Sequence, residues 1–481
     1  MSKAGSRSGG GKGKPPRGRS VLQIVLPLDD STKDPASAAE EDRDQPSGAA
    51  TPAREGRARK RKWYSLYDKV FALKNLQAAW ERVKANQGAA GSDGQSIAQF
   101  AAAAEAHLLE LHQELREKRY RPRPVRRKEI PKSGGGVRRL GIPCVRDRIV
   151  QQAVAQVLEP VFEAKFSPRS HGFRPGRGCE SALEVVDRAL RYGYGWVAEA
   201  DITEFFDSVD HELLLDAVNE EIADGSVLKL IRMFLASGIR LGSGELLPTE
   251  MGTPQGGPLS PLLANIYLHP LDVALQAAKL GLVRYADDFV ILAQSQEQAE
   301  QGLEIARQIL GGLKLHLHPT KTRIVALDRG FDFLGFHYFR DASGRLQKTV
   351  SAKSYHRFKE AVRSRTKRHA GQKRPKPNRC TLPRLKKNQR VQGMIGAVNT
   401  YLTGWHGYFQ RAQVTWQVTD FEKCDRFVRR RLRCAISGRY AKGRWQKLLS
   451  NDLMEALGLV RLTRLPVPPP AVRLNPLPNS G

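Results

Sequence analysis

The stretch Leu282–Leu292 reads LVRYADDFVIL, which is two apolar runs separated by a short acidic turn. The runs Leu282–Tyr285 and Phe289–Leu292 predict the two strands of a tight hairpin. Asp287 and Asp288 then lie at the tip of this hairpin.

A further strand is predicted over Trp196–Ile202, and the carboxylate of Asp201 lies at its end. Helices are predicted over residues 213–222, 227–237 and 261–275. Strands that alternate unevenly with helices favour an α+β fold. If the strands are neighbours, Asp201, Asp287 and Asp288 converge on one edge of a sheet.

The regions before and after this α+β segment have different residue patterns. Helical spacing predicts two helices joined by a loop over residues 63–118, and the basic stretch of residues 121–139, with its Gly-rich turn, predicts a hairpin. A helix is predicted to start near Asp147. After Arg340 the pattern is helical and basic, and residues 361–390 carry twelve Lys and Arg without an acid.

The charge of the chain indicates its class of partner. Lys and Arg number 79 against 49 Asp and Glu, a net charge of +30 on a chain that is 40% hydrophobic. This surplus favours a folded protein that holds a polyanion, and nucleic acid is the first partner to consider. No stretch approaches the ~18 apolar residues of a membrane span, and no signal peptide is evident. We therefore expect a soluble, cytoplasmic protein with no membrane partner.

Three clustered acids on a basic protein require a counter-cation. Mg²⁺ suits them because it takes a few carboxylate oxygens, and a pair of ions stabilises both the attacking and the leaving oxygen of a phosphoryl transfer. A basic surface around an acidic metal site is what a nucleotidyl transferase requires. On its local pattern alone, Asp287-Asp288 would favour a simple polar hairpin turn, and only the surrounding sequence favours a metal site.

Seven blocks of this sequence, in order, resemble the reverse transcriptases encoded by group II introns, over roughly residues 63–450. The blocks are Ile130-Pro131-Lys132 with Leu140-Gly141-Ile142-Pro143 and Asp147-Arg148, Gly172-Phe173-Arg174-Pro175, Asp201 to Asp207, Gly252 to Asn265, Tyr285-Ala286-Asp287-Asp288, Leu317 to Thr322, and Phe333-Leu334-Gly335-Phe336.

The resemblance implies a right-hand polymerase, with fingers, a palm built on an antiparallel sheet with flanking helices, and an α-helical thumb or maturase domain. The expected boundaries are 63–185 for the fingers, 186–340 for the palm and 341–465 for the thumb and maturase domain. A disordered basic and acidic extension is expected over 1–62, and a Pro-rich tail over 466–481.

The resemblance also assigns a metal site. Asp201 and Asp287 are expected to bind two Mg²⁺ ions, for which Mn²⁺ can substitute. Asp288 is expected to support them, and the Ile202 carbonyl is a further ligand. Phe206 is expected to exclude a 2′-hydroxyl and so to select deoxynucleotides. The alternative for Phe206 is an ordinary core aromatic.

Further residues are expected to bind the incoming nucleotide. Lys132 and Arg138 would contact its triphosphate, or else grip the template backbone as part of a generic basic hairpin. Gln255 would lie beside the nascent base pair. Lys321 would protonate or neutralise pyrophosphate, and a solvated surface lysine is the alternative.

Template and RNA contacts are expected in two places. Arg174 would contact the template or the nucleotide, or else stabilise its own turn, and Gly256 and Gly257 would leave room for the nascent base pair. In the C-terminal helices the expected RNA contacts are Trp405, Arg429, Arg430 and Arg431.

These features predict an RNA-directed DNA polymerase that also assists the splicing of its intron RNA. Its partners would be an RNA template, intron RNA, a DNA target or primer, and deoxynucleoside triphosphates. No nuclease-like His/Cys cluster follows residue 465, so the chain resembles the endonuclease-lacking members. Its Ala, Gly and Arg content is typical of a GC-rich bacterial genome, and we expect it to associate with the nucleoid.

Two alternatives stay open from the sequence. One is an RNA-binding maturase whose polymerase site is vestigial. The other is an intron-free, domesticated reverse transcriptase that works in antiviral defence, CRISPR spacer acquisition or repair.

Overall fold

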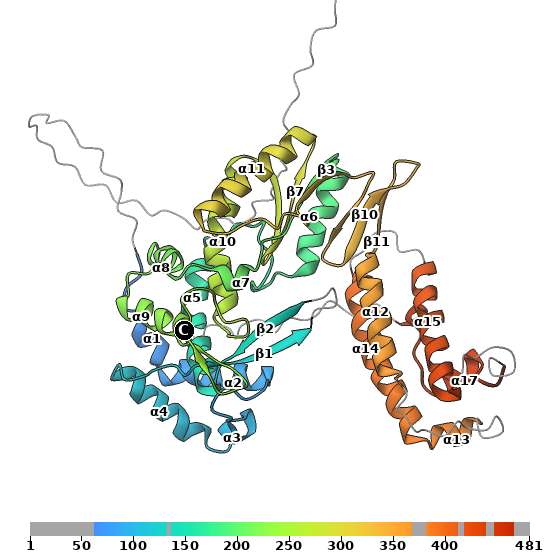
Figure 1. Ribbon diagram of the computed structural model, residues 1–481, viewed down its shortest axis with the longest axis horizontal. Coiled ribbons are helices and arrows are strands. Elements are labelled where there is room, and N and C mark those ends of the chain that lie inside the picture. The colour runs from blue at the N-terminus through green and yellow to red at the C-terminus, as the bar shows by residue number, and fades with distance from the viewer. Residues whose placement is uncertain (1–61, 132–135, 368–380, 412–417, 439–446, 466–481) are drawn as a thin grey trace, which may run out of the picture. The chain divides into compact units, whose positions relative to one another are not determined.

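A computed structural model of the chain describes residues 62–131, 136–367, 381–411, 418–438 and 447–465. Lys132, nearly all of the predicted N-terminal extension and the predicted Pro-rich tail lie outside these residues. The described part mixes helices with three sheets, so the prediction of an α+β fold is confirmed (Figure 1).

An antiparallel sheet carries the acidic hairpin. Its strand order is β6-β7-β3-β8, with β6 at Gly281–Tyr285, β7 at Asp288–Ala293, β3 at Trp196–Ala200 and β8 at Arg323–Ala326. The predicted hairpin is β6 and β7, and β3 pairs with β7 so that Ala200 lies opposite Phe289. The strands are therefore neighbours, as the convergence of the acids requires.

Both faces of this sheet are buried, and alternate residues of each strand enter different cores. On β7, Phe289 and Ile291 belong to one hydrophobic cluster, whereas Val290 and Leu292 belong to another. Helices α10 (Ser260–Ala277) and α11 (Gln296–Gly312) pack on the sheet, and their buried residues belong to the first cluster. Helix α6 (Cys179–Arg191) also packs on the sheet, and its buried residues belong to the second cluster. The continuous apolar runs of the sequence follow from this two-sided burial.

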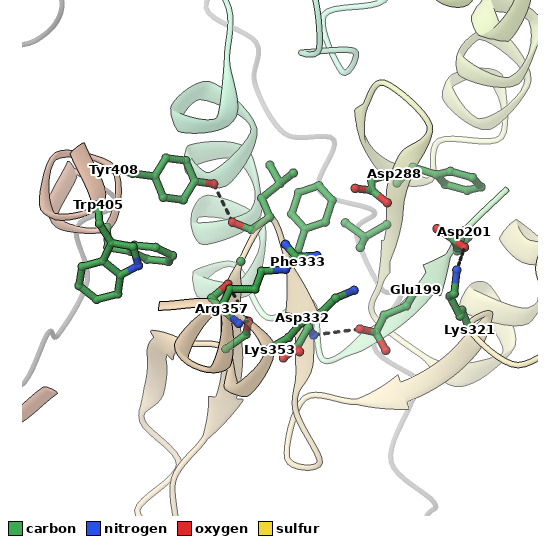
Figure 2. Close-up of a pocket in the computed structure, with 18 of the residues that line it drawn as sticks. Glu199, Asp201, Asp288, Lys321, Asp332, Phe333, Lys353, Arg357, Trp405 and Tyr408 are labelled. Atoms are coloured by element: carbon green, nitrogen blue, oxygen red, sulfur yellow. Dashed lines mark hydrogen bonds and ion pairs between the residues drawn. The ribbon is translucent and has the colours of Figure 1, made fainter. Parts of the chain in front are cut away.

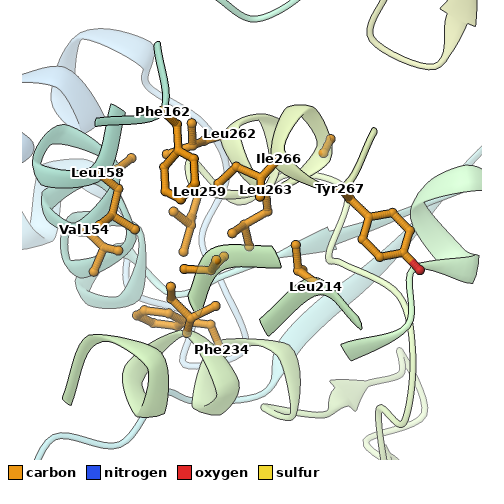
Figure 3. Close-up of a cluster of buried hydrophobic side chains, with 14 of the residues drawn as sticks. Val154, Leu158, Phe162, Leu214, Phe234, Leu259, Leu262, Leu263, Ile266 and Tyr267 are labelled. Carbon is orange, nitrogen blue, oxygen red and sulfur yellow. The ribbon is translucent and has the colours of Figure 1, made fainter. Parts of the chain in front are cut away.

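The N-terminal helices pack into the first of these clusters. Four helices occupy the region predicted to hold two, because short helices precede each long one: α1 (Tyr67–Phe71), α2 (Leu73–Asn86), α3 (Ile97–Ala101) and α4 (Ala104–Arg116). Helix α5 (Val145–Glu163) places Val154, Leu158 and Phe162 in the same cluster as residues of α10 and of two helices from the middle of the chain, α8 (His211–Asn219) and α9 (Gly225–Leu235) (Figure 3).

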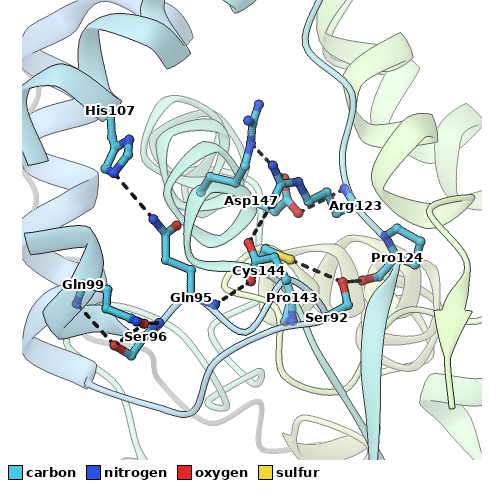
Figure 4. A network of polar contacts seen from close by, with 12 residues as sticks. Ser92, Gln95, Ser96, Gln99, His107, Arg123, Pro124, Pro143, Cys144 and Asp147 are labelled. Carbon is cyan, nitrogen blue, oxygen red and sulfur yellow. Dashed lines mark hydrogen bonds and ion pairs between the residues drawn. The ribbon is translucent and has the colours of Figure 1, made fainter. Parts of the chain in front are cut away.

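The predicted basic hairpin is present as β1 (Val125–Pro131) and β2 (Val137–Ile142), to which β4 (Ile239–Arg240) and β5 (Leu246–Leu247) add. Asp147, in the first turn of α5, anchors the approach to this hairpin (Figure 4). Its carboxylate accepts a hydrogen bond from the Tyr120 hydroxyl at 2.5 Å and one from the Arg123 backbone N–H at 3.1 Å. Burial raises the pKa of Asp147 to about 6.

The C-terminal part is helical from Ala352 onward, but a small sheet extends to Val350, so the prediction of a helical pattern directly after Arg340 is wrong for residues 346–350. This sheet holds β9 (Phe331–Phe333), β10 (Phe336–Arg340) and β11 (Leu346–Val350). The helices are α12 (Ala352–Arg365), α13 (Leu382–Lys386), α14 (Gln389–Arg411), α15 (Val418–Ser437) and α17 (Asn451–Ala456), followed by a 3₁₀ turn at Leu462–Arg464. Aromatic side chains of α12, α14 and α15 join the second cluster. No helix in the described residues is long and apolar enough to cross a membrane.

A buried ion pair fixes the acidic turn between β6 and β7. Arg284 and Asp272 expose none of their side-chain surface and pair through two hydrogen bonds of 2.6 Å each. The Arg284 guanidinium also donates to the Ala286 carbonyl and to Oδ1 of Asn265, both at 3.0 Å. The amide of Asn265 in turn donates to the Gly172 carbonyl at 2.9 Å. Helix α10, strand β6 and the turn are thus bonded to one another.

We expect Asp272→Asn to lower the free energy of unfolding by about 3–5 kcal/mol, because it leaves the Arg284 charge buried without a counter-charge. Urea denaturation measures this loss. Glu212→Gln is the matched control, because Glu212 pairs with Arg232 on the exposed surface, where such a change is worth about 1 kcal/mol or less. Equal losses of unfolding free energy in the two variants would contradict the conclusion that the buried Arg284–Asp272 pair stabilises the fold.

Candidate active site

Three carboxylates lie at one edge of the β6-β7-β3-β8 sheet. Asp201 directly follows β3, Asp287 lies in the hairpin turn, and Asp288 begins β7. The turn is tight because Ala286 takes a left-handed backbone conformation, with φ of +59°. The predicted convergence of Asp201 with the hairpin acids is therefore what the strand pairing produces.

The electrostatics of this edge favour a bound cation. Burial and the nearby charge of Asp201 raise the pKa of Asp287. Asp288 is exposed at the start of β7, but the surrounding protein partly desolvates its carboxylate. This desolvation, followed by repulsion from Asp287 and Asp201, raises the pKa of Asp288 to about 6. The ammonium of Lys321 lies 2.6 Å from Oδ2 of Asp201, so in this structure the chain itself supplies a cation (Figure 2).

The donor set fits a hard divalent ion. Carboxylate oxygens of Asp201 and Asp287 are the type of ligand that Mg²⁺ takes, with water and phosphate completing its shell. A backbone bridge between Ile202 and Leu317 uses the carbonyl of Asp201 and the N–H of Thr203, so it leaves the Ile202 carbonyl unused. Within the described ranges, no three His, Cys, Asp or Glu side chains form a ready-made metal cluster.

The loop that begins at Gly252 meets the basic hairpin. Nε of Arg138 donates to Oε1 of Gln255 at 2.9 Å, which brings two predicted nucleotide contacts together. A Cβ at Gly256 would lie 2.8 Å from the Gly141 carbonyl oxygen, and a Cβ at Gly257 would lie 2.4 Å from the amide oxygen of Gln151. Packing against backbone therefore already restricts Gly256, whereas at Gly257 the Gln151 side chain would have to move. The expectation that these glycines leave room for a nascent base pair stays a prediction.

Phe206 lies in α7 (Phe205–Ser208) and exposes only 9% of its surface. Its ring packs edge to face on Phe205, with ring centroids 5.1 Å apart. The Phe206 carbonyl accepts a hydrogen bond from the Thr253 N–H at 2.7 Å, which ties α7 to the loop that carries Gln255. Phe206 is thus a core aromatic with one small exposed edge, and its effect on sugar selection stays a prediction.

Arg174 is placed differently from its predicted template contact. It is buried, and its guanidinium pairs with both carboxylate oxygens of Glu163. The same group donates to the carbonyls of Ser167 and Ser170 at 2.6 and 2.8 Å. This geometry is the turn-stabilising alternative, and it does not support a contact with the template.

A cleft of about 620 Å³ extends from the acids toward the C-terminal helices. Its wall includes Lys353 and Arg357, one helical turn apart on α12, and the tip of the β9–β10 turn (Figure 2). The Tyr408 hydroxyl donates to the Leu334 carbonyl in this turn at 2.7 Å. Lys353 and Arg357 were not among the residues predicted from the sequence. Their i, i+4 spacing directly after the Phe333-Leu334-Gly335-Phe336 block was the available signal.

The predicted RNA contacts of the C-terminal helices fall into two classes. Trp405 is 8% exposed and belongs to the second hydrophobic cluster, so it is mainly a core residue, although it also lines the cleft. Arg430 is exposed on α15, with its guanidinium 5.7 Å from the centre of the Phe427 ring. Arg429 and Arg431 are half-buried, and Nε of Arg431 lies 3.4 Å from the Thr366 hydroxyl. Arg430 is the most accessible of the four.

Comparison with known proteins gives two matching family models. The model for the reverse transcriptase (RNA-dependent DNA polymerase) matches residues 130–338, and the model for the group II intron maturase-specific domain matches residues 379–451. Protein YkfC of Escherichia coli strain K12 is 35% identical over 292 residues, which cover 53% of this chain and 76% of YkfC.

The group II intron-encoded protein LtrA of Lactococcus lactis subsp. cremoris is 42% identical over 181 residues, which are 37% of this chain and only 30% of LtrA. Among solved structures, a chain of the partial Cas6-RT-Cas1–Cas2 complex aligns with a TM-score of 0.33 and 27% identity, covering 52% of this chain and 43% of that chain.

We expect binding of a divalent ion to the nucleic-acid-free protein to weaken by about fourfold between pH 7.5 and pH 5.5. The folded-state pKa of Asp288 is about 6, so its carboxylate is ionised at the higher pH and largely protonated at the lower, and protonation opposes cation binding. Calorimetric titration with Mn²⁺ measures this. Asp288→Asn should lose the change near pH 6, and equal wild-type affinities at both pH values would contradict the prediction.

Proposed function

The chain belongs to the reverse transcriptase family, among members that carry a group II intron maturase-specific domain, and on that premise we propose that it copies RNA into DNA at Asp201 and Asp287 and binds intron RNA through its C-terminal helices. The observation that carries the proposal is the convergence of Asp201, Asp287 and Asp288 at one sheet edge of a chain with a net charge of +30.

Asp201 and Asp287 would hold two Mg²⁺ ions, which Mn²⁺ can replace, with Asp288 and the Ile202 carbonyl in support. When bound, such ions stabilise the attacking and leaving oxygens of nucleotidyl transfer. Lys321 would move from Asp201 to the departing pyrophosphate, where its ammonium neutralises charge or donates a proton. Because the side chain of Lys321 is 58% exposed, this movement meets little steric resistance.

The residues around the acids would align the substrates. Arg138 and Gln255, already hydrogen-bonded to each other, form one polar unit that would contact the incoming deoxynucleoside triphosphate together with Lys132. Lys353 and Arg357 present cations along the cleft, where they would meet phosphates of the template–primer duplex.

The C-terminal helices would bind intron RNA by charge and shape. Arg430 is exposed on α15, and exposed cations of α12 and α13 add to the same helical region. The region matched by the maturase-specific model, residues 379–451, contains both α14 and α15. Phosphate contacts of this kind make binding steeply dependent on salt.

Primer extension tests the polymerase. On an RNA template with deoxynucleotides and Mg²⁺, the wild-type chain should make long cDNA, and Asp287→Ala or Asp201→Ala should lower the rate by at least about a thousandfold, because several kcal/mol of transition-state stabilisation are lost with the metal ligand. Asp216→Ala, an exposed aspartate on α8, should leave the rate unchanged.

A salt series completes this test. If the wild-type chain makes no product at any salt concentration while group II intron RNA still binds tightly, the polymerase proposal is wrong and a binding-only maturase replaces it.

Sugar selection can be tested at Phe206. Phe206→Ala should admit ribonucleoside triphosphates at least about tenfold more readily than wild type, because the ring no longer fills the space of a 2′-hydroxyl. The readout is the ratio of kcat/KM for matched ribo- and deoxynucleotides. Phe205→Ala is the control, since Phe205 is 2% exposed in the same core. A similar change in both variants would indicate general loosening of the core and would refute a role for Phe206.

A further inference from the structure

Phe173 is an apolar side chain at the surface directly beside the acidic turn. It is 48% exposed, and its ring centre lies 6.4 Å from that of Tyr285, the last residue of β6. The preceding segment, residues 169–172, runs along the outer side of β6. There the Arg284 N–H donates to the Arg169 carbonyl at 3.0 Å, and the His171 N–H donates to the Arg284 carbonyl at 2.8 Å. Phe173 is therefore part of the frame of the active site.

The backbone presents this ring outward under strain. Phe173 has φ of +60°, a left-handed conformation that is uncommon for a bulky residue. Its neighbours hold it there. A Cβ at Gly172 would lie only 2.4 Å from the Ala286 backbone nitrogen, and Arg174 is bonded to Glu163 and two carbonyls. Non-glycine strain of this kind persists where surrounding structure enforces it, and it clusters at functional sites.

We propose that Phe173 packs against the template–primer duplex. This inference rests on the proposed polymerase function and names a substrate contact that the function does not itself specify. A rigid ring with no charge suits the sugar and base surfaces of a nucleotide, and contacts of this kind are tolerant of sequence. Within the Gly172-Phe173-Arg174-Pro175 block, Phe173 is then the substrate contact and Arg174 is the scaffold that presents it.

The order of the sheet supports a duplex that lies across the acids. The sheet runs β6-β7-β3-β8, and Phe173 stands at the β6 side. Lys321, which lines the cleft, lies just before β8 and stands toward that side of the sheet. A duplex that reaches both Phe173 and Lys321 would thus lie across the carboxylates. By contrast, the candidate triphosphate contacts, Arg138 and Gln255, come from the basic hairpin and the loop after Gly252.

Binding of a fluorescent template–primer duplex tests the proposal without requiring catalysis. In Ca²⁺ without nucleotide, Phe173→Ala should raise the Kd by about fivefold to tenfold, and Phe173→Trp should restore affinity. The slope of log Kd against log salt should stay unchanged, because no phosphate contact is lost, whereas Arg357→Ala should reduce it. The KM for deoxynucleotides should stay within about twofold of wild type.

Two controls separate contact from folding. Tyr192→Ala removes another exposed aromatic, placed before β3 at the end remote from Asp201, and should leave the Kd unchanged. Phe173→Gly relieves the left-handed strain, so its melting temperature should equal or exceed that of wild type while its duplex affinity falls. A lower melting temperature with unchanged duplex affinity would make Phe173 structural and overturn the proposal.

Two further outcomes of these experiments also test the duplex contact. An unchanged Kd in Phe173→Ala, or a loss confined to the KM for nucleotide, overturns the duplex contact. If the wild-type chain binds duplex but makes no cDNA, the proposed polymerisation fails, and weaker binding by Phe173→Ala still supports the contact.

Discussion

Arg284 and Asp272 have no solvent-exposed side-chain surface, and the placement of the acidic turn follows from their pairing. Burying either charge without a partner would cost several kcal/mol, so the two side chains must be buried together as an ion pair. The Arg284 guanidinium also needs the amide oxygen of Asn265 and the carbonyl of Ala286 as hydrogen-bond acceptors. Asn265 belongs to α10 and Ala286 to the turn. The pair can form only when helix, strand and turn have their native relation. The buried charges therefore help to set the position of Asp287, together with the strand pairing of the hairpin.

The sheet edge concentrates negative charge on a chain that is strongly positive overall. Strands buried on both faces hold Asp201, Asp287 and Asp288 near one another, and the mutual repulsion of the acids helps to raise the pKa values of Asp287 and Asp288. Lys321 relieves part of this repulsion through its contact with Asp201. A divalent ion at the proposed metal site would offer more charge to the same oxygens than this ammonium does, and would displace Lys321 from Asp201.

The sequence was most informative where the signal is local. The hairpin around Asp287 and the strand before Asp201 follow from apolar runs with acids at their ends, and their pairing agrees with the predicted convergence. The roles of Arg174, Gly256 and Trp405 could not be predicted in this way, because each depends on a distant partner: Glu163 for the arginine, the Gly141 carbonyl for the glycine and a cluster of aromatic side chains for the tryptophan. The sequence motifs indicated that these three residues make important contacts, but not whether each contact is within the protein or with a substrate.

Left-handed backbone at non-glycine residues surrounds the acids on several sides. Phe173, Ala286 and Leu334 have φ of +60°, +59° and +46°, and each conformation costs about 1–2 kcal/mol relative to the right-handed one. A hydrogen bond to a carbonyl at or next to each residue opposes its relaxation: Asn265 to Gly172, Arg284 to Ala286 and Tyr408 to Leu334. The frame around the site is thus strained and held by buried or aromatic partners, so it is shaped before any substrate arrives. Because Tyr408 comes from α14, the C-terminal helices take part in holding the polymerase site, and a change in their packing would reach the cleft through Leu334.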